Sequence, residues 1–126
     1  MEQQLRIIKE TSILIEEKKY NQAKNILLDY IKHEKNSKKD IKFYYNLYLT
    51  FNGLGEIKEA KRYLEKCYNL NKKNYIVINN LANIFLKEGK VVKAEEYYLR
   101  SFNLKKDYLI VIVNLAVFYQ NIGRLN

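Results

Sequence analysis

The sequence predicts an all-α fold, a right-handed superhelical solenoid of antiparallel helix pairs with seven helices in about three and a half repeats. Two patterns support this prediction: a motif that recurs at one constant spacing along the chain, and apolar residues at helical spacing within each copy. Composition agrees, because the chain of 126 residues has no proline and only four glycines. Helix pairs this short cannot bury an apolar face alone, so the repeats are expected to stack and share a core.

The motif is clearest in residues 75–108, which predict a helix, a tight turn at Gly89 and a second helix. When this copy is aligned on the preceding one, Gly89 falls on Gly55 and Ala94 falls on Ala60. Glycine directly after an apolar stretch is typical of a helix that ends in the left-handed conformation. Alanine at a fixed position is expected where the two helices of a pair cross closely.

The first helix pair is expected at residues 3–17 and 20–33, with a turn at the lysines between them. A polar connection follows at residues 34–40, and Asp40 is expected to cap the next helix. One side of the first helix carries Leu5, Ile8, Ser12 and Ile15, and another side carries Ile7 and Leu14.

The remaining helices follow the repeat, and Gly123 is expected to mark the turn after the last of them. They are expected at residues 42–52, 56–70, 75–87, 91–104 and 108–121. The chain is predicted to be one domain, residues 1–126, with repeats at about 4–37, 41–74 and 75–108 and the first helix of a fourth in 109–126.

This pattern resembles the tetratricopeptide repeat (TPR) family, and the resemblance is strongest from Ile41 onward. The sequence departs from the family pattern in having no tryptophan or proline, with Lys72 and Lys106 where the family often has proline. The matching residues are Tyr44, Leu47, Phe51, Gly55, Ala60 and Leu64, then Ile78, Leu81, Ala82, Phe85, Gly89, Ala94, Tyr98 and Ser101, then Ile112, Leu115, Ala116, Tyr119 and Gly123.

The resemblance implies a protein-interaction module or scaffold. In the TPR family the first helix of each pair lines a concave groove, which holds a segment of a partner protein. The Lys–Asn–basic clamp with which chaperone-binding members hold a C-terminal carboxylate is absent from the matching positions, so a neutral extended or helical segment is expected instead. The groove residues carried over by register are Lys42, Tyr45, Asn46, Leu49, Asn79, Asn80, Asn83, Lys87, Asn114 and Val117.

Asn46, Asn80 and Asn114 occupy the same position of successive repeats. An amide both donates and accepts hydrogen bonds, so it can bind the backbone of an extended peptide whatever that peptide's side chains. The alternative is that these amides satisfy the backbone of neighbouring helices, since buried amides must find partners.

The last expected helix is apolar nearly all round, which is typical of burial on both sides. Large apolar patches rarely stay exposed. We therefore expect this helix to be covered by a continuation of the chain or by a second copy, and the remaining alternative is an exposed end. The residues expected to mediate self-association are Leu109, Ile112, Val113, Leu115 and Val117.

No catalytic, metal or cofactor site is predicted, and the protein is not expected to be an enzyme. His33 is the single histidine and is expected to be solvated at a helix end. Cys67 is the single cysteine and is expected to be buried and inert. One histidine and one cysteine, far apart in sequence, cannot supply a catalytic triad or a metal cluster.

The net charge of +9 raises nucleic acid as the less favoured alternative partner. Lysines in the connections between repeats are expected to form a basic rim, but arginine, the usual reader of bases, is scarce. With no apolar leader at its start and apolar runs of only about 12 residues, the protein is expected in the cytoplasm and not in a membrane. The rim lysines are Lys35, Lys38, Lys39, Lys72, Lys73, Lys105 and Lys106.

Overall fold

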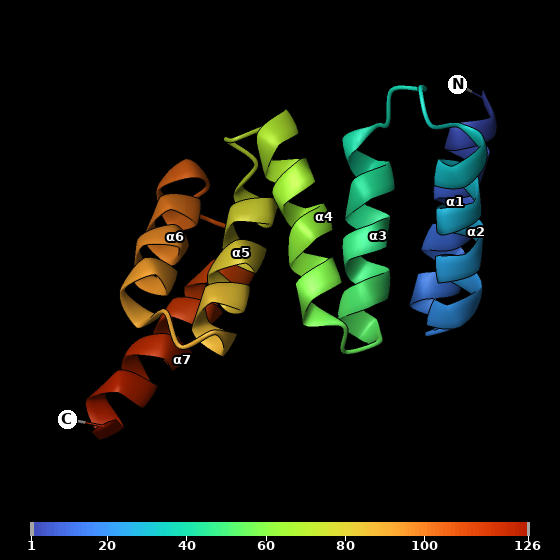
Figure 1. Cartoon of the computed structure of the whole chain (residues 1–126). Helices are drawn as coiled ribbons and strands as arrows, with labels where there is room; N and C mark the ends of the chain where they lie inside the picture. Colours follow the sequence, from blue (N-terminus) through green and yellow to red (C-terminus); the bar gives the residue numbers. More distant parts are fainter. Residues whose placement is uncertain (1, 126) are drawn as a thin grey trace. The chain divides into compact units, whose positions relative to one another are not determined.

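The computed structural model describes residues 2–125, with side chains as far as residue 123, and most of this length is helical (Figure 1). The described residues form no strand, which confirms the predicted all-α fold of seven helices. In chain order the helices are α1 (Glu2–Glu16), α2 (Tyr20–His33), α3 (Ile41–Gly53), α4 (Ile57–Leu70), α5 (Tyr75–Lys87), α6 (Val91–Leu104) and α7 (Leu109–Leu125).

The helices belong to two compact units that divide between Leu70 and Asn71. The first unit contains α1 to α4, and the second contains α5 to α7. Within each unit, one pair of helices lies side by side and antiparallel, α3 with α4 in the first and α5 with α6 in the second (Figure 1). The prediction that the whole chain is one domain stays a prediction.

The glycine turns and alanine crossings lie where the repeat predicted them. Gly55 and Gly89 follow α3 and α5 with φ of 76° and 78°, in the left-handed region that favours glycine. Ala60 in α4 and Ala94 in α6 are fully buried. The predicted turn geometry and the predicted close crossings are therefore both confirmed.

The buried side of α1 is mostly polar. Gln4, Ile8 and Thr11 are buried, whereas Leu5 is 52% exposed and Ser12 is also exposed. Polar side chains are stable inside a protein when their hydrogen bonds are satisfied, and those of α1 are.

Gln4 ties α1 to the connection that precedes α3. Its Nε2 donates to the carbonyl oxygen of Lys38 at 2.9 Å, and its Oε1 accepts from the backbone N–H of Asp40 at 2.6 Å. Asp40 in turn caps α3, because its carboxylate accepts from the N–H of Lys42 at 2.8 Å. The predicted N-cap is confirmed, and the start of α3 is fixed from both sides.

Gly123 does not mark a turn. It lies inside α7, which continues to Leu125, and its φ is not positive. Glycine costs a helix only about 1 kcal/mol relative to alanine, so it does not end a helix by itself. After α3 and α5 the chain folds back, and Gly55 and Gly89 take the left-handed backbone that this reversal requires.

Candidate functional site

The amide of Asn46 joins two helices of the first unit and does not lie on an open surface. Its Nδ2 donates to the carbonyl oxygen of Ile8 at 3.0 Å, to Oγ1 of Thr11 at 3.0 Å and to Oγ of Ser12 at 3.1 Å. The side chain is 6% exposed. Of the two alternatives for this position, Asn46 fits the second, in which the amide satisfies a neighbouring helix.

Asn114 makes the corresponding bond in the second unit. Its Nδ2 donates to Oδ1 of Asn79 at 3.0 Å and lies 3.5 Å from Oδ1 of Asn83, which also accepts from the hydroxyl of Tyr98. Asn114 and Asn46 thus both bond to a residue 35 positions earlier, in the preceding first helix. At Asn46 and Asn114, the asparagine that repeats in the sequence is a link between first helices.

Asn79 is fully buried, which corrects its predicted place on an open groove wall. Within the described part of the chain, its Nδ2 has no hydrogen-bond partner. A buried unpaired amide hydrogen costs on the order of 1–3 kcal/mol. The other predicted groove residues are more accessible: Lys42, Lys87 and Val117 are exposed, and Tyr45, Leu49, Asn80, Asn83 and Asn114 are half-buried.

α7 packs on its own unit through one side and exposes two apolar edges. Val111 and Phe118 are buried, and the ring of Phe118 lies 5.7 Å from that of Tyr98 in α6. We call Ile110, Val113 and Val117 the inner edge, and they are 55%, 58% and 48% exposed. We call Leu109, Ile112, Ala116 and Tyr119 the outer edge, where the three larger side chains are 73%, 38% and 45% exposed.

Each edge follows helical spacing, so its side chains share one face of α7. The predicted self-association residues divide between these edges. Leu109 and Ile112 lie on the outer edge, Val113 and Val117 lie on the inner edge, and Leu115 is half-buried between α7 and its unit. The sequence predicted that α7 would be apolar all round, but it did not separate the two edges.

Cys67 has a structural role that recurs in the repeat. Its Sγ lies 3.6 Å from the carbonyl oxygen of Ile41, and Ser101, at the same position of the next repeat, donates to the carbonyl oxygen of Tyr75 at 2.7 Å. Burial raises the pKa of the Cys67 thiol to about 12. A thiol that stays protonated in this way is a poor nucleophile.

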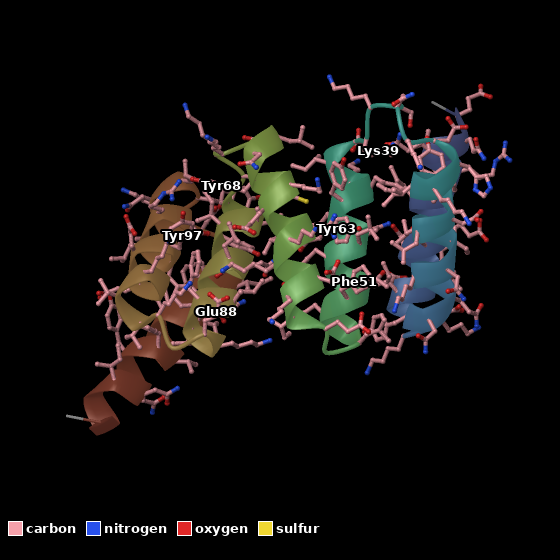
Figure 2. The ribbon with its side chains drawn as sticks, viewed as in Figure 1. Lys39, Phe51, Tyr63, Tyr68, Glu88 and Tyr97 are labelled. Carbon is pink, nitrogen blue, oxygen red and sulfur yellow. The ribbon has the colours of Figure 1, made fainter. Side chains whose placement is uncertain are left out.

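Aromatic rings line the contact between the two helices of each pair. In the first unit Tyr63 of α4 stacks on Phe51 of α3 at 5.6 Å and on Tyr44 at 6.3 Å (Figure 2). In the second unit Phe85 of α5 meets Tyr97 of α6 edge to face at 4.9 Å. Burial raises the pKa of Tyr63, so this ring remains an uncharged packing residue at neutral pH.

Lys39 is buried and does not belong to a basic rim. Its Nζ donates to the carbonyl oxygens of Glu34 and Ser37 and to Oγ of Ser37, and it lies 5.6 Å from the centre of the Tyr30 ring (Figure 2). The ammonium group therefore stabilises the connection between α2 and α3 by bonding to groups within it. Hydrophobicity patterns gave no signal for this role, because lysine is rarely buried.

A cavity of about 380 Å³ lies beside this connection in the first unit. Its polar lining is already engaged in the bonds that close the connection, because Gln4 and Lys39 use their donors there. Its lining residues are Gln4, Tyr30, Ser37, Lys38, Lys39 and Asp40.

His33 lies at the exposed end of α2, where its Nδ1 is 3.3 Å from the carboxylate of Asp29. Across residues 2–123, no group of three or more His, Cys, Asp or Glu side chains is placed to hold a metal ion. None of the described helices is long and apolar enough to cross a membrane.

Helix pairs with glycine turns, alanine crossings and asparagine links define a TPR-like helical-repeat protein. The fold is similar to the C-terminal TPR-containing domain of the Plasmodium falciparum protein named FK506-binding protein PFL2275c, with a TM-score of 0.79 and 14% identity, covering 97% of this chain and 89% of that one. It is also similar to BtubC (BKLC) from P. vanneervenii, with a TM-score of 0.73 and 20% identity, covering 93% of this chain and 57% of that one.

By sequence, the chain belongs to the family described as Domain of unknown function (DUF6340), which it matches over residues 9–124. No curated protein matches it in sequence. At identities of 14% and 20%, the two structural similarities establish the fold alone.

Proposed function

We propose that this protein is a non-catalytic interaction module that binds a segment of a partner protein along the inner edge of α7. The observation that carries the proposal is one face of α7, on which Ile110, Val113, Asn114 and Val117 follow the spacing i, i+3, i+4, i+7. Three of these side chains are large, apolar and about half exposed. Apolar side chains that cluster on a surface in this way mark interaction sites.

The chemistry of this face favours a neutral partner segment. Residues 109–123 contain no charged side chain, so the face offers apolar contact without ion pairs. Beside it, the amides of Asn114 and Asn83 are half-buried and already joined to each other. They offer their remaining hydrogen-bonding capacity to a peptide backbone. An extended or helical segment with aliphatic side chains suits this combination.

The remaining parts of the proposal are a cytoplasmic location and the absence of catalysis. The buried Cys67 thiol, with its raised pKa, and the solvated His33 support a binding role over a chemical one. The lysines of the connections are less suited to nucleic acid than predicted, because Lys39 is buried and Lys105 lies 3.3 Å from the carboxylate of Asp107.

The proposal is tested by capture of partners from lysate, followed by affinity measurement on the partner identified by mass spectrometry. The double variant Val113→Lys/Val117→Lys places two charges on the inner edge and is expected to weaken that affinity by at least about tenfold, or 1.4 kcal/mol. Its matched control is Ile112→Lys, on the same helix but on the outer edge. Equal loss of affinity in both variants, with unchanged helicity, would contradict the proposed site.

A further inference from the structure

We propose that α7 pairs with the α7 of a second copy of this chain through its outer edge, Leu109, Ile112, Ala116 and Tyr119. The contact goes beyond the proposed function, which uses the inner edge of the same helix. The two edges adjoin on α7, but Ala116 of the outer edge and Ile110 of the inner edge lie about 120° apart around the helix, so substitutions at these two positions test the edges separately.

The outer edge consists of the positions that α5 uses to pack against α6. The counterparts in the preceding repeat are Ile78, Ala82 and Phe85, with exposures of 0%, 0% and 5%. Phe85 meets Tyr97 of α6 in a direct ring contact. On α7 the same positions are partly open: Ile112 is 38% and Tyr119 is 45% exposed, and the Tyr119 hydroxyl donates to the carboxylate of Glu95 in α6 at 2.7 Å. The repeat therefore defines what fits this edge, namely an antiparallel helix with a small residue at the crossing.

α7 itself meets that description. In the α5–α6 pair both helices have an alanine, Ala82 and Ala94, and both alanines are fully buried. Ala116 occupies the position of Ala82 on α7. Two antiparallel copies of α7 related by a twofold axis place Ala116 against Ala116, which reproduces the small-residue crossing. Such an interface is self-complementary, because each copy contributes the same surface.

Within a second copy, charge favours α7 over α4 or α6 as the helix that fills the outer edge. A helix that fills the outer edge while staying packed on its own unit needs apolar side chains on two sides. α4 has six charged residues and α6 has four, whereas α7 has none from residue 109 to residue 123. Two chains of net charge +9 repel each other, and this uncharged stretch lets them approach with the least repulsion.

The antiparallel arrangement also brings sterically compatible side chains of the two copies together along the helix. In this register Leu109 of one copy comes opposite Gly123 of the other, and Ile112 and Tyr119 of each copy lie on either side of the paired alanines. A side chain added at Gly123 would meet nothing within 4 Å in its own chain, so this position has room for Leu109 of a partner. One helix face is small beside interfaces of about 1,600 Å², so we expect a dimer that dissociates on dilution.

The first test is sedimentation equilibrium from about 1 to 500 μM, a range that spans the weak affinities of small interfaces. The full chain is expected to approach twice its mass of 15.2 kDa. Ala116→Arg places a charge at the centre of the contact and is expected to raise the dimer dissociation constant at least about tenfold. Ile110→Arg, on the inner edge of the same helix, is the matched control and is expected to dimerise like the unchanged chain.

The second test maps the contact by oxidative crosslinking. A cysteine at position 116, from Ala116→Cys, is expected to form an intermolecular disulfide, because facing alanines bring the two Cα atoms within reach. Ile110→Cys should crosslink at least about tenfold more slowly, since the inner edges of the two copies lie apart. The native Cys67 is fully buried, so it does not compete.

A chain that stays at 15.2 kDa over the whole range overturns the proposal. So does a dimer that Ala116→Arg leaves intact, or equal crosslinking at positions 116 and 110. If Ala116→Arg loses its helical circular dichroism, the smaller Ala116→Cys change decides. Loss of the dimer with partner affinity retained, or the reverse, distinguishes failure of this contact from failure of the inner-edge proposal.

Discussion

Single residues in this protein gain their roles from the helix that packs on them. Asn46 and Asn114 are chemically suited to hold a peptide, yet each donates to the preceding first helix. Lys39 is chemically suited to a basic rim, yet its ammonium group closes a connection. The residue type set the available hydrogen bonds, and the neighbouring helix determined how they are used.

The thiol of Cys67 gives a pH-dependent prediction at this scale. Burial raises its pKa from 9.0 to about 12 in the folded protein, so the folded state holds the proton more tightly than the unfolded chain. The resulting stability is fully present below about pH 9 and is lost as pH rises toward 12. At about pH 10 we expect a loss of roughly 1 kcal/mol relative to pH 7, measured by urea unfolding.

Cys67→Ser is the matched control for this prediction. It places in α4 the residue that α6 has at the corresponding position, Ser101, where the hydroxyl bonds to the start of α5. The variant should fold and should lack the thiol-dependent part of the alkaline loss, including the interaction by which the Cys67 thiolate raises the pKa of Tyr44. The lysines are common to both proteins. An identical alkaline loss in both proteins would show that the thiol does not contribute.

At the scale of elements, the same residue type ends one helix and continues another. Gly55 and Gly89 take left-handed backbone after α3 and α5, and the chain then folds back into α4 and α6. Gly123 lies within α7 in open space. Glycine permits a helix to end, and it ends α3 and α5 where the chain reverses.

Alanine substitution at these glycines should therefore have opposite effects. Gly89→Ala forces a side chain into the left-handed region and is expected to destabilise the protein by about 1–2 kcal/mol. Gly123→Ala removes a glycine from a helix interior and is expected to stabilise it by about 0.5–1 kcal/mol. Thermal unfolding of the two variants checks both signs. Destabilisation by Gly123→Ala would mean that α7 ends at this glycine.

For the whole molecule, net charge and the apolar edges of α7 act against each other. A charge of +9 opposes contact between copies, whereas the uncharged helix favours it. Because salt screens this repulsion, the affinity of the proposed dimer is expected to depend on ionic strength.

Salt is expected to tighten the dimer. Between about 20 and 200 mM salt, screening over a Debye length that shortens to about 10 Å or less weakens the repulsion between copies. We expect the dissociation constant to fall a few-fold, measured by sedimentation equilibrium. Nucleic-acid binding through the lysines would respond in the opposite way, since phosphate contacts weaken steeply with salt. A dimer that weakens with salt would contradict an apolar contact.

The sequence by itself determined the helix pairs, the turns at Gly55 and Gly89, the alanine crossings, the cap at Asp40 and the apolar nature of α7. These features depend on spacing and backbone conformation, which are local or recur from one repeat to the next. Only the tertiary structure decided that Gln4 faces the core, that Lys39 and Asn79 are buried, and that α7 exposes an inner and an outer edge. Those outcomes depend on which donors and acceptors form hydrogen bonds between helices that are distant in sequence. The periodicity of apolar residues does not predict such bonds.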